Sequence, residues 1–145
     1  VMLTDQLCCQ AKEAGSFLAS IAKTHCKSGK KLAYIAGGET VVNITGHGKG
    51  GRNQEIALSA AECIKGMSNA AVFSIGSDGT DGPTDAAGGY SDGDTAGVLK
   101  NKGIDIFEVL KNNDAYNALK LTEGLIITGP TGTNVNDVSV LLISD

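Results

Sequence analysis

Residues Thr45 to Glu55 read TGHGKGGRNQE, a stretch in which four glycines come directly before a helical pattern. Small residues let backbone N–H groups approach a ligand, and a helix start offers unpaired N–H groups and a partial positive charge. Lys49 and Arg52 add full positive charges there. We interpret the stretch as an anion site suited to phosphate. The alternative is a structural turn with solvated charges, although an arginine at a helix start opposes the helix dipole.

Two familiar phosphate-binding motifs do not account for this stretch. Gly46, Gly48 and Gly51 match the dinucleotide pattern G-x-G-x-x-G, but no strand ending in Asp or Glu follows about 20 residues later to bind a ribose. The P-loop pattern fails because Arg52 and Asn53 stand where it requires a lysine and a hydroxyl residue. What remains is a glycine-rich turn with two cations at the N-terminus of a helix.

Helical periodicity surrounds this turn. Apolar residues recur at three- and four-residue spacing from Thr4 to about Lys27, with Thr4 as the expected N-cap, and again from about Asn53 to Lys65. Three shorter helices are expected, at Thr95 to Lys102, at Ile106 to Leu110, and after a cap at Asn113 or Asp114. The anion turn therefore leads into one of two long amphipathic helices.

Apolar runs between the helices predict about five strands. They lie at Leu32 to Ala36, Thr40 to Ile44, Ala70 to Ile75, Leu125 to Thr128 and Val138 to Ile143. We expect the first two to form a hairpin and the third to be buried on both faces. Alternating helices and strands indicate an α/β layered domain, with a mixed, mostly parallel sheet flanked by helices. No linker or repeat interrupts residues 1–145, so one domain is expected.

A second glycine-rich loop, GSDGTDGPTDAAGG, follows the predicted strand at Ala70 to Ile75. Asp78 and Asp81 in this loop could bind Mg²⁺ through one or two carboxylate oxygens, or accept hydrogen bonds from sugar-like hydroxyls. Ordinary turn chemistry is the alternative, because Asp beside Gly is common in turns. Asp92 and Asp94 are expected to cap a helix.

A third loop, TGPTGTNVND, follows the predicted strand at Leu125 to Thr128. Thr131, Thr133 and Asn134 in it are neutral groups that suit phosphate or carboxylate oxygens, but such residues also hold loops together by bonding their own backbone. All three glycine-rich loops follow predicted strand ends. In open α/β sheets ligands bind beyond the carboxyl ends of the strands, so we expect the loops to converge there.

Composition excludes several classes of function. A net charge of −4 and only six Tyr and Phe residues argue against nucleic acid as a partner. No apolar run reaches the roughly 18 residues of a membrane span, so no membrane partner is expected. The four cysteines lack C-x-x-C spacing, which indicates reduced thiols in a cytoplasmic protein.

Five motifs in this order resemble the MOFRL domain, the C-terminal part of the glycerate 2-kinase family, which also includes hydroxypyruvate-linked proteins. The motifs are GGET (37–40), GKGGRNQE (48–55), SDGTDGPTDAAGG (77–89), NNDAY (112–116) and TGPTGTNVND (128–137). The resemblance runs from about Leu32 to the end. It implies transfer of the γ-phosphoryl group of ATP to glycerate, giving 2-phosphoglycerate, in a cleft between this domain and a larger N-terminal α/β domain. That domain is expected to carry a catalytic lysine and much of the ATP site.

The resemblance also suggests roles for individual residues. Arg52 would stabilise the substrate carboxylate or the moving phosphoryl group, and Asp78 and Asp81 would hold Mg²⁺ or orient the substrate hydroxyl. The further residues predicted to bind substrate or phosphate are Lys49, Gly50, Gly51, Asn53, Thr80, Thr131, Gly132, Thr133 and Asn134. The chain begins at Val1 without an initiator methionine, so we expect a C-terminal part of a two-domain protein. A freestanding anion-binding module and a scaffold domain remain the alternatives.

Overall fold

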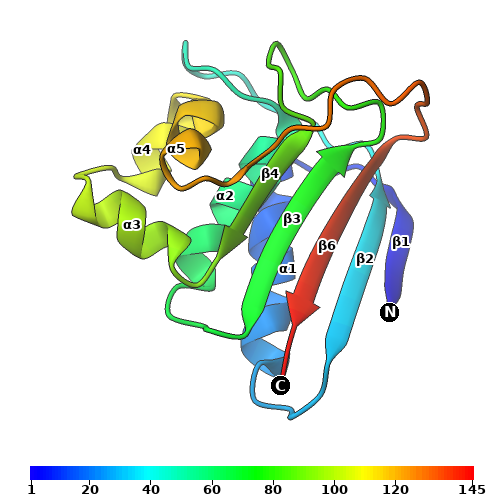
Figure 1. Cartoon of the computed structure of the whole chain (residues 1–145), viewed down its shortest axis with the longest axis vertical. Helices are drawn as coiled ribbons and strands as arrows, with labels where there is room; N and C mark the ends of the chain where they lie inside the picture. The colour runs from blue at the N-terminus through cyan, green and yellow to red at the C-terminus, as the bar shows by residue number, and fades with distance from the viewer.

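Three apolar strands form the centre of a six-stranded sheet: β2 (Leu32–Gly38), β6 (Asp137–Ile143) and β3 (Ala70–Gly76). The computed structural model describes every residue from Val1 to Asp145. The outer strands are β1 (Met2–Leu7), β4 (Gly88–Asp92) and β5 (Leu125–Ile126). The strand order is β1-β2-β6-β3-β4-β5, so the last strand of the chain lies between two earlier ones (Figure 1).

The α/β fold and the mixed sheet are confirmed, but the prediction that the sheet is mostly parallel is wrong. Only β1 and β2 run parallel, whereas β6 pairs antiparallel with both β2 and β3, and β4 pairs antiparallel with β3 and β5. The cause is the position of β6, which enters between two strands that point the same way and runs against both. The pattern of apolar residues within a strand does not indicate which other strands it pairs with.

The helices form two groups on one side of the sheet. The long helices α1 (Ala11–His25) and α2 (Arg52–Cys63) lie behind the sheet in Figure 1. Apolar side chains of α1 and α2, such as Leu18 and Ile56, form one buried core with the sheet. The short helices α3 (Thr95–Asn101), α4 (Ile106–Lys111) and α5 (Ala115–Leu121) pack on the other flank of α2, in a second core. Helix α2 is therefore buried between the two cores.

Two further predictions of local structure are wrong. The expected helix from Thr4 is a strand up to Leu7, because this segment pairs with β2, and α1 begins only at Ala11. The expected strand at Thr40 to Ile44 is irregular, with a single bridge between Val41 and Gln10. No hairpin forms there because β2 already has β1 and β6 as neighbours. Strand β4 has no sequence signal of its own, because its first two residues, Gly88 and Gly89, continue the glycine-rich loop.

The sheet is apolar on both faces, although helices cover only one. On the face without helices, apolar side chains of β2, β6 and β3 lie opposite one another. Val140 of β6, for example, pairs with Ile35 of β2 and with Phe73 of β3. None of the three belongs to either buried core. Leu142 on the same face is 42% exposed. Antiparallel sheets that face water usually carry polar residues on that side, so this open face has the composition of a covered one.

No helix of the chain has the length and apolar character needed to cross a membrane. The four cysteines are free thiols.

Candidate functional site

The three glycine-rich loops lie together at one end of the sheet. Thr131 donates its backbone N–H to the carbonyl of Asp78 at 3.2 Å, and Val135 donates to the Ser77 hydroxyl at 2.7 Å. The first loop meets the second where Gly51 lies against the Asp81 carboxylate. Hydrogen bonds from backbone and side chains therefore join loops that are 28 to 85 residues apart in the chain.

The first loop, from Thr45 to Gly51, packs against the turn between α4 and α5. Gly46 donates its N–H to Asn113 Oδ1 at 3.0 Å, and Lys49 donates its N–H to Asp114 Oδ1 at 2.8 Å. Gly48 approaches this turn so closely that an added Cβ would lie 2.4 Å from Asp114 Cβ. Most N–H groups of the loop are therefore committed to the NND segment and are not free to bind an anion.

Three donors at the end of the loop remain available. The backbone N–H groups of Gly50, Gly51 and Arg52 have no acceptor within the chain, whereas the next two in the helix, from Asn53 and Gln54, donate to Asp81. The start of α2 therefore supports the predicted anion site, but with fewer donors than expected: only these three consecutive N–H groups are free to bind an anion.

Asp81 is the N-terminal cap of α2, supplied from another loop. Its Oδ1 accepts the N–H of Asn53 at 3.1 Å and its Oδ2 accepts the N–H of Gln54 at 2.9 Å, while the cap position itself, Gly51, has no side chain. The residue is 3% exposed. Burial raises its pKa, and the hydrogen bonds from Asn53 and Gln54 act in the opposite direction. Both oxygens are occupied, so the metal ligation predicted for Asp81 has no geometric support.

Asp78 differs because it is only half-buried at the loop surface. Its Oδ1 accepts the N–H of Thr80 at 3.0 Å, and this bond is the main cause of its lowered pKa. No group of three or more His, Cys, Asp and Glu side chains lies close enough together to hold a metal ion. The chain thus offers Asp78 as a single carboxylate ligand, which is a common way for Mg²⁺ to be held when phosphates supply other ligands.

Arg52 is fixed in place by two carboxylates. Its Nε and Nη2 donate to Asp137 Oδ2 and Oδ1 at 2.5 and 3.2 Å, and its Nη1 lies 2.9 Å from Glu39 Oε1. The Asp137 hydrogen bond is the main cause of a raised Arg52 pKa, so the guanidinium is charged. The Asp137 side chain is 6% exposed, against 58% for Glu39. The sequence alone indicates neither partner, although Glu39 lies in the GGET motif just after β2 and Asp137 is the last residue of TGPTGTNVND and the first of β6.

A cavity of about 630 Å³ opens between the first loop and the segment after β2. Its wall includes Gly50, Gly51 and Arg52, three of the residues predicted to form the site. Glu55, one turn further along α2, lines it as well and is 5% exposed. Burial raises the pKa of Glu55, partly offset by the hydrogen bond from Asn113. The cavity therefore combines free backbone donors, a guanidinium and a buried carboxyl group.

The other predicted site residues do not line this cavity. The Lys49 ammonium lies 4.0 Å from the centre of the Tyr116 ring, and Asn53 is buried between Asp81 and Ser74. In the third loop, the Thr131 hydroxyl donates to the Ser77 carbonyl, and Asn134 accepts from Asn136. Gly132 and Thr133 lie in the same turn of the third loop. Thr80 lies in the second loop and donates its N–H to Asp78. These contacts match the alternative in which such residues hold their own loops together.

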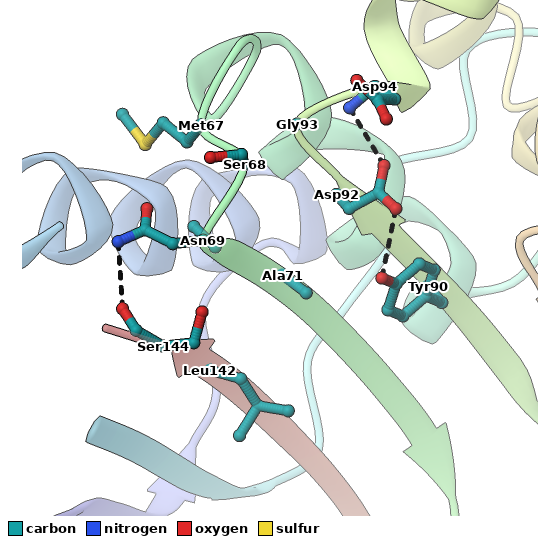
Figure 2. Close-up of a pocket in the computed structure, with 11 residues that line it drawn as sticks. Met67, Ser68, Asn69, Ala71, Tyr90, Asp92, Gly93, Asp94, Leu142 and Ser144 are labelled. Atoms are coloured by element: carbon teal, nitrogen blue, oxygen red, sulfur yellow. Dashed lines mark hydrogen bonds between the residues drawn. The ribbon is translucent and has the colours of Figure 1, made fainter. Parts of the chain in front are cut away.

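A smaller cavity of about 270 Å³ lies at the opposite end of the sheet, where β3 begins (Figure 2). Figure 2 shows the Tyr90 hydroxyl donating to Asp92 Oδ2, at 3.1 Å. The other Asp92 oxygen accepts the backbone N–H groups of Asp94 and Thr95 at the start of α3, which confirms the predicted capping role of Asp92. Asp94 occupies the N-cap position itself, but its side chain makes no capping hydrogen bond. This end of the sheet shares no residue with the glycine-lined cavity.

Comparison with known proteins agrees with the motif resemblance. The MOFRL family profile matches residues 32–137. A D-glycerate 2-kinase of Thermotoga maritima is 56% identical over 146 residues, which cover 98% of this chain and 35% of that protein. A glycerate 2-kinase of Pyrococcus horikoshii is 47% identical over 148 residues, which cover 99% of this chain and 33% of that protein.

A solved structure gives the same result. The crystal structure of the Thermotoga maritima glycerate kinase superposes with a TM-score of 0.94 at 55% identity, covering 99% of this chain and 36% of that chain. The chain thus spans about a third of the length of these relatives. The family profile covers most of the sequence and includes the loops that form the cavity, so the chain belongs to the MOFRL family.

Proposed function

We propose that this chain forms one wall of the site at which a glycerate kinase transfers the γ-phosphoryl group of ATP to glycerate. The observation that carries the proposal is the placement of Arg52. Its guanidinium is held by Asp137 at the wall of a glycine-lined cavity, next to three backbone N–H groups without acceptors. Phosphoryl transfer depends mainly on positioning and charge stabilisation, and a fixed guanidinium with nearby N–H donors supplies both.

The charge balance indicates that further cations are needed. One guanidinium faces two carboxylates, those of Asp137 and Glu39, so the cluster carries net negative charge. A phosphate would be repelled unless more positive charge enters with it. We assign this charge to Mg²⁺, with Asp78 as its protein ligand, and to a lysine of a larger N-terminal domain. Bound Mg²⁺ would neutralise charge on the phosphate oxygens.

The open face of the sheet supports a two-domain arrangement. The relatives are about three times as long as this chain, and the face formed by Ile35, Val140 and Phe73 is apolar without helices over it. We propose that residues 1–145 work joined to an N-terminal α/β domain, with the substrate bound between them. The free thiols support a cytoplasmic location for the whole protein.

The test is Arg52→Ala in the full-length enzyme. We expect glycerate-dependent turnover to fall by about 100-fold or more, because a fixed donor to the transferring group is lost. Arg52→Lys keeps the charge but loses the two-pronged geometry, so its turnover should lie between those of the wild type and the alanine variant. Lys31→Ala, at the far end of β2 in an exposed ion pair with Asp145, is the control. Turnover close to wild type for Arg52→Ala would reject the proposal.

A further inference from the structure

Glu55 is the one buried carboxyl group in the cavity wall that the proposed function does not use. It follows Arg52 by three positions on α2, a spacing that puts two side chains on neighbouring points of one helix face, with their Cβ atoms about 5–6 Å apart. Both residues line the same cavity. A small molecule that carries an anionic group and a hydroxyl a few bonds apart can therefore reach both.

The hydrogen bonds of Glu55 hold its carboxyl group and leave one oxygen free. Oε1 accepts from Asn113 Nδ2 at 2.9 Å, and no group in the chain bonds to Oε2. Asn113 is itself fixed, because its Oδ1 accepts the N–H groups of Thr45 and Gly46. No ion pair reaches Glu55. A buried carboxylate without a partner cation lowers the stability of the fold. A neutral side chain could accept the Asn113 hydrogen bond equally well, so a purely structural role would not require the charge of Glu55.

A second polar group in the cavity wall lacks a partner. Thr40 is 4% exposed and lines the cavity, and its hydroxyl makes no hydrogen bond. Buried hydroxyl groups are almost always satisfied, so an exception calls for an explanation. The cavity wall thus offers an unused acceptor on Glu55 and an unused hydroxyl on Thr40, which is the complement that a ligand hydroxyl needs.

We propose that Glu55 binds the attacking hydroxyl of the hydroxy acid and accepts its proton, while Thr40 hydrogen-bonds to the same ligand and the acid's anionic group faces Arg52. This inference rests on the proposed function and assigns a catalytic residue to it. As the hydroxyl oxygen bonds to the γ-phosphorus of ATP, its proton passes to Glu55 Oε2. The bond from phosphorus to the bridging oxygen breaks, and its electron pair leaves with ADP.

The charges around Glu55 suit this role. Burial raises the pKa of its carboxyl group, Lys12 of α1 and the Asn113 bond lower it, and Asp81 raises it. The net effect is a pKa above that of an ordinary Glu. A general base is more effective when its pKa lies closer to the working pH, so this direction favours proton transfer.

The test compares Glu55→Gln with Arg52→Ala in the full-length enzyme. Gln keeps an acceptor for Asn113 but cannot take a proton. We expect kcat to fall by about 100-fold or more, KM for glycerate to change little, and the acidic limb of the kcat–pH profile to disappear. Glu62→Gln, an exposed position on the same helix, is the matched control and should keep wild-type kcat.

The outcomes separate the inference from the proposed function. If Glu55→Gln keeps kcat within about threefold while Arg52→Ala abolishes it, the inference is wrong and the proposed function stands. If neither variant loses turnover, the proposed function itself fails. If the Gln variant does not fold, Glu55→Asp is the second test. This variant keeps the charge but has a shorter side chain, so its carboxylate lies further from the ligand; it must lower kcat and shift the acidic limb of the kcat–pH profile. An unchanged limb in that variant would overturn the inference.

Discussion

Arg52 at the start of α2 and Asp137 at the start of β6 form a two-pronged ion pair, with Nε to Oδ2 at 2.5 Å and Nη2 to Oδ1 at 3.2 Å. The pair joins the helix that begins at the cavity to the strand that completes the sheet. Asp137 pairs in register with Gly38 of β2 and Gly76 of β3, so its position is set by both neighbouring strands. The guanidinium is therefore anchored to the centre of the sheet.

Replacing Asp137 should lower stability, since it leaves a charged group without its buried partner. We expect Asp137→Asn to reduce the free energy of unfolding by about 1–3 kcal/mol, because the Arg52 side chain is partly exposed and the loss is smaller than for a fully buried pair. Urea denaturation of the purified chain would measure this. The control is Asp145→Asn, which breaks the exposed pair with Lys31 and should change little. Equal effects of the two substitutions would contradict the prediction.

The capping of α2 by Asp81 gives a second prediction. Asp81→Ala removes the acceptor of two backbone N–H groups and of the Asn53 amide, all of them buried. We expect a loss of about 2–4 kcal/mol in unfolding free energy, which combines a lost cap with unsatisfied buried donors. Asp78→Ala, in the same loop but only half-buried and accepting a single backbone N–H, should cost much less stability. A small effect of Asp81→Ala would show that water can replace the cap.

Glycine substitutions at two positions should act in opposite directions. A Cβ at Gly51 would lie 2.4 Å from Asp81 Cγ and 2.6 Å from the Asp81 carbonyl carbon, so Gly51→Ala must displace the loop and is expected to destabilise the protein. Gly97 lies inside α3 with nothing within 4 Å of an added Cβ. Gly97→Ala should therefore stabilise the chain by about 0.5–1 kcal/mol. Thermal unfolding of both variants provides the comparison.

Local signals predicted the helices better than the sheet. The 3.6-residue period placed α2 to within about two residues, because its apolar stripe faces a core regardless of the rest of the fold. The N-terminal prediction failed where the same period ran on into β1, whose strand conformation comes from pairing with β2. Likewise, the antiparallel insertion of β6 between β2 and β3 is a tertiary choice that no single run of residues records.

The candidate site could be predicted only in part, for a similar reason. Glycines and cations identified the loop before α2, and Arg52 does line the cavity. The partners of Arg52 come from Glu39 and Asp137, two residues at distant strand ends whose meeting depends on strand order. Conversely, the sequence suggests a metal ligand at Asp81 because it does not show that this residue lies beside the start of α2. The N-cap position of that helix is Gly51, which has no side chain, so Asp81 caps the helix instead.

Glu55 should reduce stability at neutral pH. Its pKa is raised in the folded chain, so folding is favoured while the carboxyl group is protonated, and that contribution is lost as the pH rises through the folded-state pKa. Glu55→Gln cannot ionise and avoids this loss. We expect the variant to be more stable than wild type near neutral pH, with the advantage shrinking as the pH falls through the raised folded-state pKa and gone below the ordinary Glu value of about 4.3. Asp81 repels the Glu55 charge, so the substitution also relieves Asp81, whose pKa is raised by burial, and this adds to the gain of the variant.

Urea denaturation of wild type and Glu55→Gln across this pH range would measure the effect. Glu62→Gln, exposed on the same helix, is the control and should show no comparable pH-dependent gain. A stabilising substitution in a cavity wall is what is expected where a side chain is kept for its chemistry at a cost in stability. A variant less stable than wild type at neutral pH would instead indicate that the charge of Glu55 supports the fold.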